Sequence, residues 1–122
     1  MNLNKPYKRV DRINRQILDI LSDILLKNID LSYLGFITFT SVDVAPDLRT
    51  AKVFYSVFSG KLPDSKVDVE INKKQKAFKK FMSPQLSLRY TPDIRFILDE
   101  TLAYSEKIDN LLKDQDEIHR PK

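Results

Sequence analysis

Two runs of β-branched and aromatic residues limit most strongly what this chain can fold into. They cover 36–44 and 50–58 and are joined by the short segment Ala45-Pro46-Asp47-Leu48. Residues of this kind favour strands, and proline and aspartate favour turns. The connection is too short for a crossover, so the two strands are predicted to form an antiparallel hairpin. A later run, 93–98, alternates apolar and polar residues and predicts a third strand.

The remaining segments show helical periodicity. Between 8 and 27, apolar residues recur at spacings of three and four, which predicts an amphipathic helix. Asp64 or Ser65 is a candidate cap for a second helix that reaches about Met82. Ser83-Pro84 favours a helix restart, because proline suits a first helical position. A last helix is predicted over 101–114, followed by a polar tail, 115–122.

The predicted order is helix, strand, strand, helix, break, helix, strand, helix. It indicates an α+β fold with a three-stranded sheet covered by helices on one face. A length of 122 residues fits one domain, 1–122, with an ordered core of about 8–114. No run approaches the roughly 18 apolar residues of a membrane span, and residues 1–6 lack the apolar stretch of a secretory signal. We therefore expect a cytoplasmic protein without a membrane partner.

Groups that usually carry catalysis are scarce. The chain has no cysteine, His119 is its only histidine, and Gly35 and Gly60 are its only glycines. These counts exclude a disulfide framework, a cysteine metal site and a glycine-rich phosphate loop. The adjacent acids Asp99 and Glu100 are interpreted as complementing a helix N-terminus. We predict no enzyme activity, no cofactor, no metal and no small-molecule substrate.

Charge is distributed unevenly along the chain. The net charge is +4, yet 99–117 holds seven acids against two lysines. By contrast, 73–80 holds five lysines and no acid: Lys73, Lys74, Lys76, Lys79 and Lys80. On a continuous helix, three of them (Lys73, Lys76 and Lys80) would share one face. Such a block favours a phosphate backbone as partner, although a lysine run is also compatible with a solvated helix face.

Other residues could contribute to the same interaction. The first helix carries Arg9, Arg12 and Arg15, and Arg89 precedes the third strand. Tyrosines can stack on bases, but we interpret Tyr33, Tyr55, Tyr90 and Tyr104 as half-buried structural residues.

Four segments resemble the ribosome-binding factor A family. The stretch 43–57 is similar to its hairpin signature, the helix from Arg9 onward to its opening, 88–100 to its closing strand, and 108–112 to its last helix. The resemblance implies a type II KH-like fold. It also implies binding to the small ribosomal subunit and its ribosomal RNA, near the decoding region, during late maturation. No catalysis and no cofactor are implied, and bacterial growth in the cold is expected to depend on such a factor.

One departure from the family pattern concerns a kink between two helices. The family has Ala-x-Gly there, and this chain has Lys74-Gln75-Lys76. Glycine adopts positive φ at little cost, whereas lysine does not. Either the kink forms without glycine, or the helix runs through and the break moves to Ser83-Pro84. We predict the second arrangement.

Two functions from different classes follow. The first is a non-catalytic assembly factor that binds ribosomal RNA as a monomer and favours one RNA conformation. The second is a protein-interaction module whose hairpin and acidic last helix contact ribosomal proteins or another assembly factor, with the lysines serving only solubility.

Overall fold

The computed structural model describes residues 5–101, with side chains from residue 9 onward. Its elements follow the predicted order through the third strand: α1 (Lys5–Lys27), η2 (Ser32–Leu34), β1 (Phe36–Val44), β2 (Thr50–Phe58), α2 (Asp64–Asn72), α3 (Gln75–Met82), η3 (Ser83–Gln85) and β3 (Asp93–Leu98). All three strands have the predicted bounds. The predicted last helix over 101–114 lies outside the described residues except at Thr101, and the tail over 115–122 lies wholly outside them.

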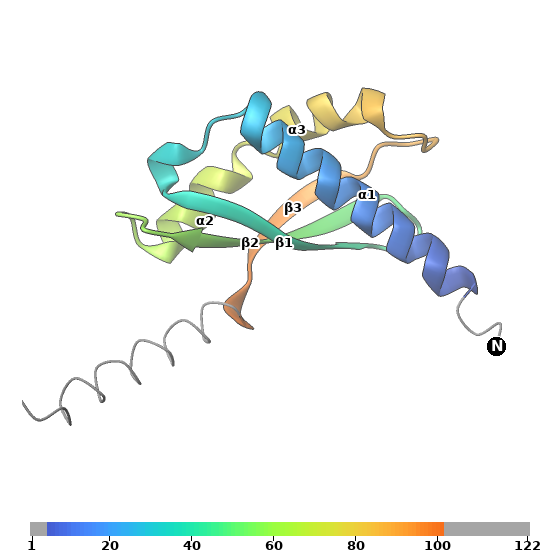
Figure 1. The fold of residues 1–122 in the computed structure, drawn as a ribbon, viewed down its shortest axis with the longest axis horizontal. Coiled ribbons are helices and arrows are strands. Elements are labelled where there is room, and N and C mark those ends of the chain that lie inside the picture. The colour runs from blue at the N-terminus through green and yellow to red at the C-terminus, as the bar shows by residue number, and fades with distance from the viewer. Residues whose placement is uncertain (1–4, 102–122) are drawn as a thin grey trace, which may run out of the picture.

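The three strands form one mixed sheet in the order β1-β2-β3 (Figure 1). The first two strands pair antiparallel, with Phe36 opposite Phe58 and Val44 opposite Ala51. The third strand pairs parallel with β2, so that Thr50 lies opposite Asp93. A parallel pair needs a crossover connection, and α2 with α3 supplies it. The antiparallel pairing of β1 with β2 confirms the predicted hairpin.

The helices cover one face of the sheet. Figure 1 shows α1 running across it, and buried residues alternate with exposed ones along each strand. The centre of the core is an aromatic trio of Phe39, Phe78 and Phe96, one each from β1, α3 and β3, with ring centroids 5.2–5.6 Å apart. This packing places α3 over the sheet and presents its opposite side to solvent.

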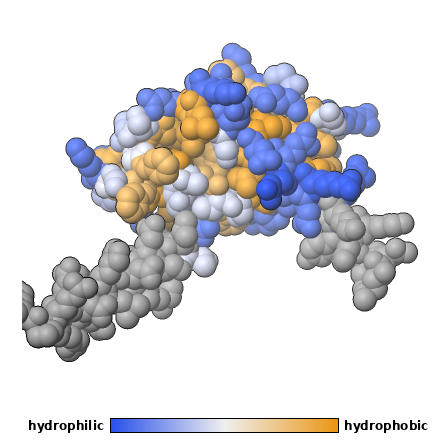
Figure 2. Space-filling model, viewed as in Figure 1, coloured by the Kyte–Doolittle hydropathy of each residue, from blue (hydrophilic) through white to orange (hydrophobic). Residues whose placement is uncertain are grey.

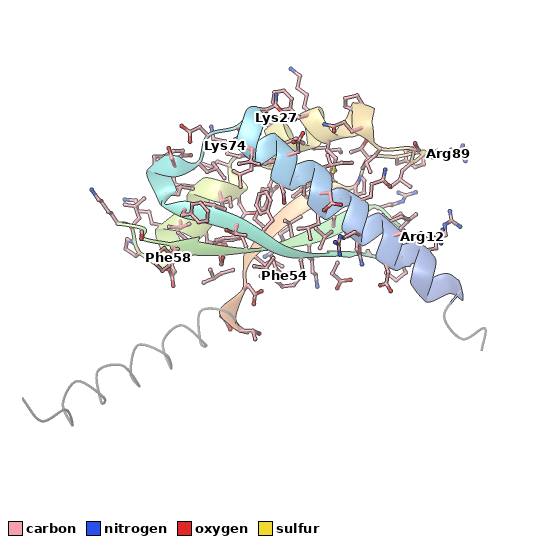
Figure 3. The ribbon with its side chains drawn as sticks, in the orientation of Figure 1. Arg12, Lys27, Phe54, Phe58, Lys74 and Arg89 are labelled. Atoms are coloured by element: carbon pink, nitrogen blue, oxygen red, sulfur yellow. The ribbon has the colours of Figure 1, made fainter. Side chains whose placement is uncertain are left out.

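The other face of the sheet is not covered by a helix within residues 5–101. Phe36 and Phe58 lie opposite each other there, and their side chains are 70% and 60% exposed. Figure 3 shows Phe54 and Phe58 on the side of the sheet away from α1. In Figure 2, orange atoms reach the surface beside the end of β2. The sheet thus has an exposed apolar pair at one end of its open face.

The helix break lies at Lys73 and Lys74, between α2 and α3. The prediction of one helix running to Met82, with its break at Ser83-Pro84, is therefore wrong. Lys73 has φ −66° and ψ −17°, and Lys74 has φ −95° and ψ 5°. Neither value is in the left-handed region, so the kink needs no glycine. At Ser83 the chain instead passes from α3 directly into η3.

The break is held by the side chain of Asn72. Its Nδ2 donates to the Phe96 carbonyl at 3.0 Å, and its Oδ1 accepts from the Phe96 N–H at 2.9 Å. The carboxamide therefore occupies the outer edge of β3, where a further strand would pair. Gln75 Nε2 also donates to Asn72 Oδ1, at 2.7 Å. These bonds fix the end of α2 at the sheet edge, and α3 starts in a new direction.

The start of α2 also differs from the sequence prediction. Asp64 is the first helical residue, Pro63 precedes it, and no side chain caps the helix. Aspartate in the first turn still complements the positive end of the helix dipole.

Candidate nucleic-acid interface

Three of the predicted lysines surround a hollow on the solvent side of α3. Lys76, Lys79 and Lys80 line it together with Ser83, Pro84 and Thr91, and its volume is about 520 Å³. Lys79 Nζ lies 2.7 Å from Asp93 Oδ1, which ties α3 to the start of β3. Lys76 and Lys80 are exposed, and neither forms an ion pair within the described part of the chain. Two cations without an ion-pair partner among residues 9–101 therefore face solvent at this hollow.

The other two lysines occupy the helix break. Lys73 Nζ contacts Glu70 Oε1 at 3.2 Å, whereas Lys74 has no ion-pair partner among residues 9–101. Because the break interrupts the helix, the prediction that Lys73, Lys76 and Lys80 share one helical face is wrong.

A second hollow, of about 720 Å³, lies between the helix break and β3. Its polar lining residues come from α2, the break, α3 and β3: Asp68, Asn72, Lys73, Gln75 and Arg95. Lys73 lines this second hollow, and Lys76, Lys79 and Lys80 line the first one along α3.

The predicted arginines are spread over the surface. Arg9, Arg12 and Arg15 are exposed on α1, and Arg15 Nε lies 3.9 Å from Asp19 Oδ1. Such an exposed pair contributes little to stability. Figure 3 shows Arg12 and Arg89 toward one end of the molecule and Lys74 toward the other. The candidate residues therefore form an extended surface and not one compact site.

Two further residues join this surface: Arg49, which the sequence analysis did not single out, and Tyr90, which it interpreted as structural. Tyr90 is 62% exposed, and the Cζ atoms of Arg89 and Arg49 lie 5.6 Å and 6.0 Å from its ring centroid. Arg49 immediately precedes β2, and Tyr90 lies just before β3. Because these strands are parallel and in register at Thr50 and Asp93, the segments before them meet at one end of the sheet. A prediction that β2 and β3 pair in parallel would have placed Arg49 near Tyr90.

The interpretation of the tyrosines as half-buried is wrong for Tyr90 and for Tyr33, which is 54% exposed. Tyr55 is fully buried, and its hydroxyl donates to Asp68 Oδ1 at 2.9 Å. Burial raises the pKa of Tyr55 well above its ordinary value, and Asp68 raises it further. Tyr55 is therefore a structural residue, and Tyr104 lies outside the described residues.

Neither a metal centre nor a membrane span is found in the part of the chain that the structure describes. No group of three or more histidine, cysteine or carboxylate side chains there is arranged to hold an ion. No helix there is long and apolar enough to cross a bilayer. The chemistry that the described surface offers is binding of anions by exposed ammonium and guanidinium groups, beside an exposed aromatic ring.

The chain is similar in sequence to a known protein family. The family model for ribosome-binding factor A matches residues 9–112. The chain belongs to the ribosome-binding factor A family. A ribosome-binding factor A of Pediococcus pentosaceus is 37% identical over 105 residues, covering 85% of this chain and 90% of that protein.

Solved structures of ribosome-binding factor A share the fold. A putative member from Thermotoga maritima is 27% identical, with a TM-score of 0.63 over 78% of this chain and 90% of that one. A homology model of the Thermus thermophilus ribosome-binding factor A, as fitted into the cryo-EM map of a 30S complex, is 13% identical, with a TM-score of 0.54 over 69% of this chain and 88% of that one. The predicted type II KH-like α+β fold is confirmed. In this member of the family, the kink between α2 and α3 lies at Lys73 and Lys74.

Proposed function

We propose that this chain is a non-catalytic ribosome biogenesis factor. It binds the small ribosomal subunit through ribosomal RNA during late maturation and so assists rRNA processing. The observation that carries the proposal is the lysine surface of α3, formed by the lysines of the break and of α3 (Lys73, Lys74, Lys76, Lys79 and Lys80). Three of these lysines, Lys74, Lys76 and Lys80, lack an ion-pair partner among residues 9–101. Membership of the family and the 30S complex of the Thermus thermophilus relative support the choice of particle.

The contacts proposed for this surface are with phosphates. Lysine is a flexible point charge that pairs with phosphate oxygens but does not distinguish bases. Lys73, Lys74, Lys76, Lys79 and Lys80 would follow the RNA backbone along α3, and Arg89, Arg9, Arg12 and Arg15 would extend the interface at the other end. Glycine at a kink lets an RNA backbone approach closely. With lysine there, longer side chains would make the contact instead.

The proposed mechanism needs no bond to be made or broken. A protein that binds one RNA conformation more tightly than others shifts the population toward it by the difference in binding free energy. A rigid surface suits this role, and α3 is tied to the sheet through Phe78 in the core and the Lys79–Asp93 pair. The protein would thereby hold immature ribosomal RNA in one arrangement.

The test is co-sedimentation with purified small subunits, large subunits and intact ribosomes at low and moderate salt. Binding to small subunits alone is expected, with a log–log salt slope of roughly 0.7–0.9 per phosphate contact. The triple variant Lys74→Ala, Lys76→Ala, Lys80→Ala should bind more weakly and show a shallower slope. Unchanged affinity for small subunits in this variant would show that the lysine surface is not the interface.

A charge-matched control separates local contacts from overall charge. The variant Lys27→Ala, Lys61→Ala, Lys66→Ala removes three exposed lysines from outside α3. It should retain most of the affinity. Equal losses in both variants, or equal binding to every particle, would reduce the lysines to a non-specific polycation.

A protein-interaction module is the second candidate, and the exposed pair of Phe36 and Phe58 on the open sheet face favours it. Contact with a ribosomal protein through this apolar face would be nearly independent of salt, because it does not depend on charge. Binding that survives the lysine substitutions but is lost on Phe58→Ser would favour this function.

We further propose that the protein acts as a monomer in the cytoplasm, without a membrane or small-molecule partner, and that growth in the cold depends on it. Analytical ultracentrifugation of the free protein and growth of a deletion strain at low temperature test these points.

A further inference from the structure

The loop before β3 displays an exposed aromatic ring with two cations near it. Tyr90 is 62% exposed, and the guanidinium carbons of Arg89 and Arg49 lie 5.6 Å and 6.0 Å from its ring centroid. Arg89 is the neighbour of Tyr90 in the chain, whereas Arg49 comes from the turn between β1 and β2. Two separate segments therefore converge on one exposed ring.

The backbone that follows this ring is fixed by two hydrogen bonds and one buried residue. The Asp93 N–H donates to the Arg49 carbonyl at 2.8 Å, which joins the loop to the hairpin turn. Thr91 Oγ1 donates to Ser83 Oγ at 2.9 Å, and Pro92 is fully buried. A ring displayed by a fixed loop loses little conformational entropy when a ligand binds.

The charges around the ring are not neutralised by an ion pair among the described residues. Asp93 pairs with Lys79, and Asp47 Oδ1 accepts from the backbone N–H of Arg49. No carboxylate forms an ion pair with either guanidinium among residues 9–101. Two like charges near one ring repel each other, and an anion between them would relieve that repulsion.

A nucleotide combines the two properties that this arrangement accepts. Its base offers a flat face for stacking on an aromatic ring, and its phosphates pair with guanidinium groups. The hollow lined by Lys76, Lys79 and Lys80 includes Thr91, the residue after Tyr90. A strand that stacks a base on Tyr90 therefore has a basic path beside it.

We propose that Tyr90, Arg49 and Arg89 form a stacking site for one unpaired base of single-stranded RNA, with the two arginines binding the phosphates on either side of it. The inference rests on the proposed function, because the lysines of α3 would hold the rest of the strand. A base inside a duplex keeps both faces covered by its neighbours, so the site selects an unpaired nucleotide.

The experiment measures binding of a fluorescein-labelled octauridine to the full chain by anisotropy, at several salt concentrations. Tyr90→Leu, which keeps apolar bulk without an aromatic face, should weaken binding roughly tenfold. Tyr90→Phe should bind within about twofold of the parent, since stacking needs only the ring. Tyr33→Leu, which removes the similarly exposed tyrosine of η2, should have no effect.

Salt dependence separates stacking from charge. Arg49→Ala and Arg89→Ala should each lower the log–log salt slope by roughly 0.7, whereas Tyr90→Leu should leave the slope unchanged. A blunt-ended RNA duplex of about eight base pairs, which has no unpaired base, should bind the parent and Tyr90→Leu equally. A merely structural role for Tyr90 would not produce this pattern.

Each result bears on one of the two proposals. Octauridine binding that is unchanged in Tyr90→Leu, or absent in the parent at low salt, overturns the stacking site. If Tyr90→Leu weakens octauridine binding while the triple lysine variant keeps its affinity for small subunits, the stacking site stands and the lysine interface fails. A loss in both variants supports both.

Discussion

Two connections in the helical layer differ in what holds them: the break between α2 and α3 at Lys73–Lys74, and the end of α3 at Ser83–Pro84. At the second connection the cause is local. Proline lacks an N–H and cannot continue an α-helical hydrogen-bond ladder, and by Leu86 the backbone is extended, with φ −102° and ψ 136°.

At the first connection no residue breaks a helix by its own chemistry. Lysine is a good helix former, and both residues have negative φ. The break instead coincides with the two hydrogen bonds between Asn72 and Phe96, residues that lie 24 positions apart in the chain. A helix end that arises from local chemistry is visible in sequence, whereas one that arises from a distant partner is not.

Among substitutions that test this difference between the two connections, Asn72→Ala should lower the free energy of unfolding most. The substitution removes both bonds to β3 and leaves the Phe96 N–H and carbonyl without their partner, so we expect a loss of about 3 kcal/mol in the free energy of unfolding. Urea denaturation followed by circular dichroism measures it. Asn28→Ala, at an exposed position, is the control and should change stability little. A loss below about 0.5 kcal/mol for Asn72→Ala would mean that another contact fixes the break.

An intermediate effect is expected for Tyr55→Phe, which removes the bond between β2 and Asp68 of α2. We expect a loss of about 1 kcal/mol at neutral pH. Because the folded-state pKa of Tyr55 is raised above its ordinary value of 10.0, its contribution is fully present below pH 10 and is lost as pH rises above it.

The measurement for Tyr55 is urea denaturation between pH 7 and pH 11. The parent should lose stability above pH 10 more steeply than Tyr55→Phe does. Parallel curves for the two proteins would contradict the assignment of this pH dependence to Tyr55.

The smallest effect should follow Pro84→Ala. Pro84 is exposed in η3, and its replacement changes mainly the entropy of the unfolded chain, so the free energy of unfolding should fall by at most about 1 kcal/mol. Thermal unfolding of the variant, with Pro46→Ala as an exposed turn control, measures this. A larger loss at Pro84 than at Asn72 would reverse the comparison and make the proline connection the one that organises the helical layer.

Much of the fold could be predicted because its signals are local. The strands over 36–44, 50–58 and 93–98 are visible from β-branched and aromatic residues that alternate with polar ones. The helix over 8–27 is visible from its apolar spacing, and the structure extends it only to Lys5. In each case the spacing of the apolar residues both buries one face of the element and shows whether it is a helix or a strand.

The candidate site was predictable only as a set of charges. The lysines of 73–80 are evident in the sequence, and Glu70 and Lys73 have the local spacing of a helical ion pair. The pair between Lys79 and Asp93 joins α3 to β3 and is not evident there. The aromatic part of the surface was missed, because Arg49 and Tyr90 lie far apart in the chain and meet only through the parallel pairing of β2 with β3.

The sequence by itself determined the first helix, the three strands, the α+β class and the excess of positive charge on the segment that became the break and α3. Those properties depend on periodicity and composition, which act over a few residues. The tertiary structure alone decided where the helix breaks, that Lys79 pairs with Asp93 and which arginines meet Tyr90. Each of these depends on hydrogen bonds or contacts between segments that only the folded sheet brings together.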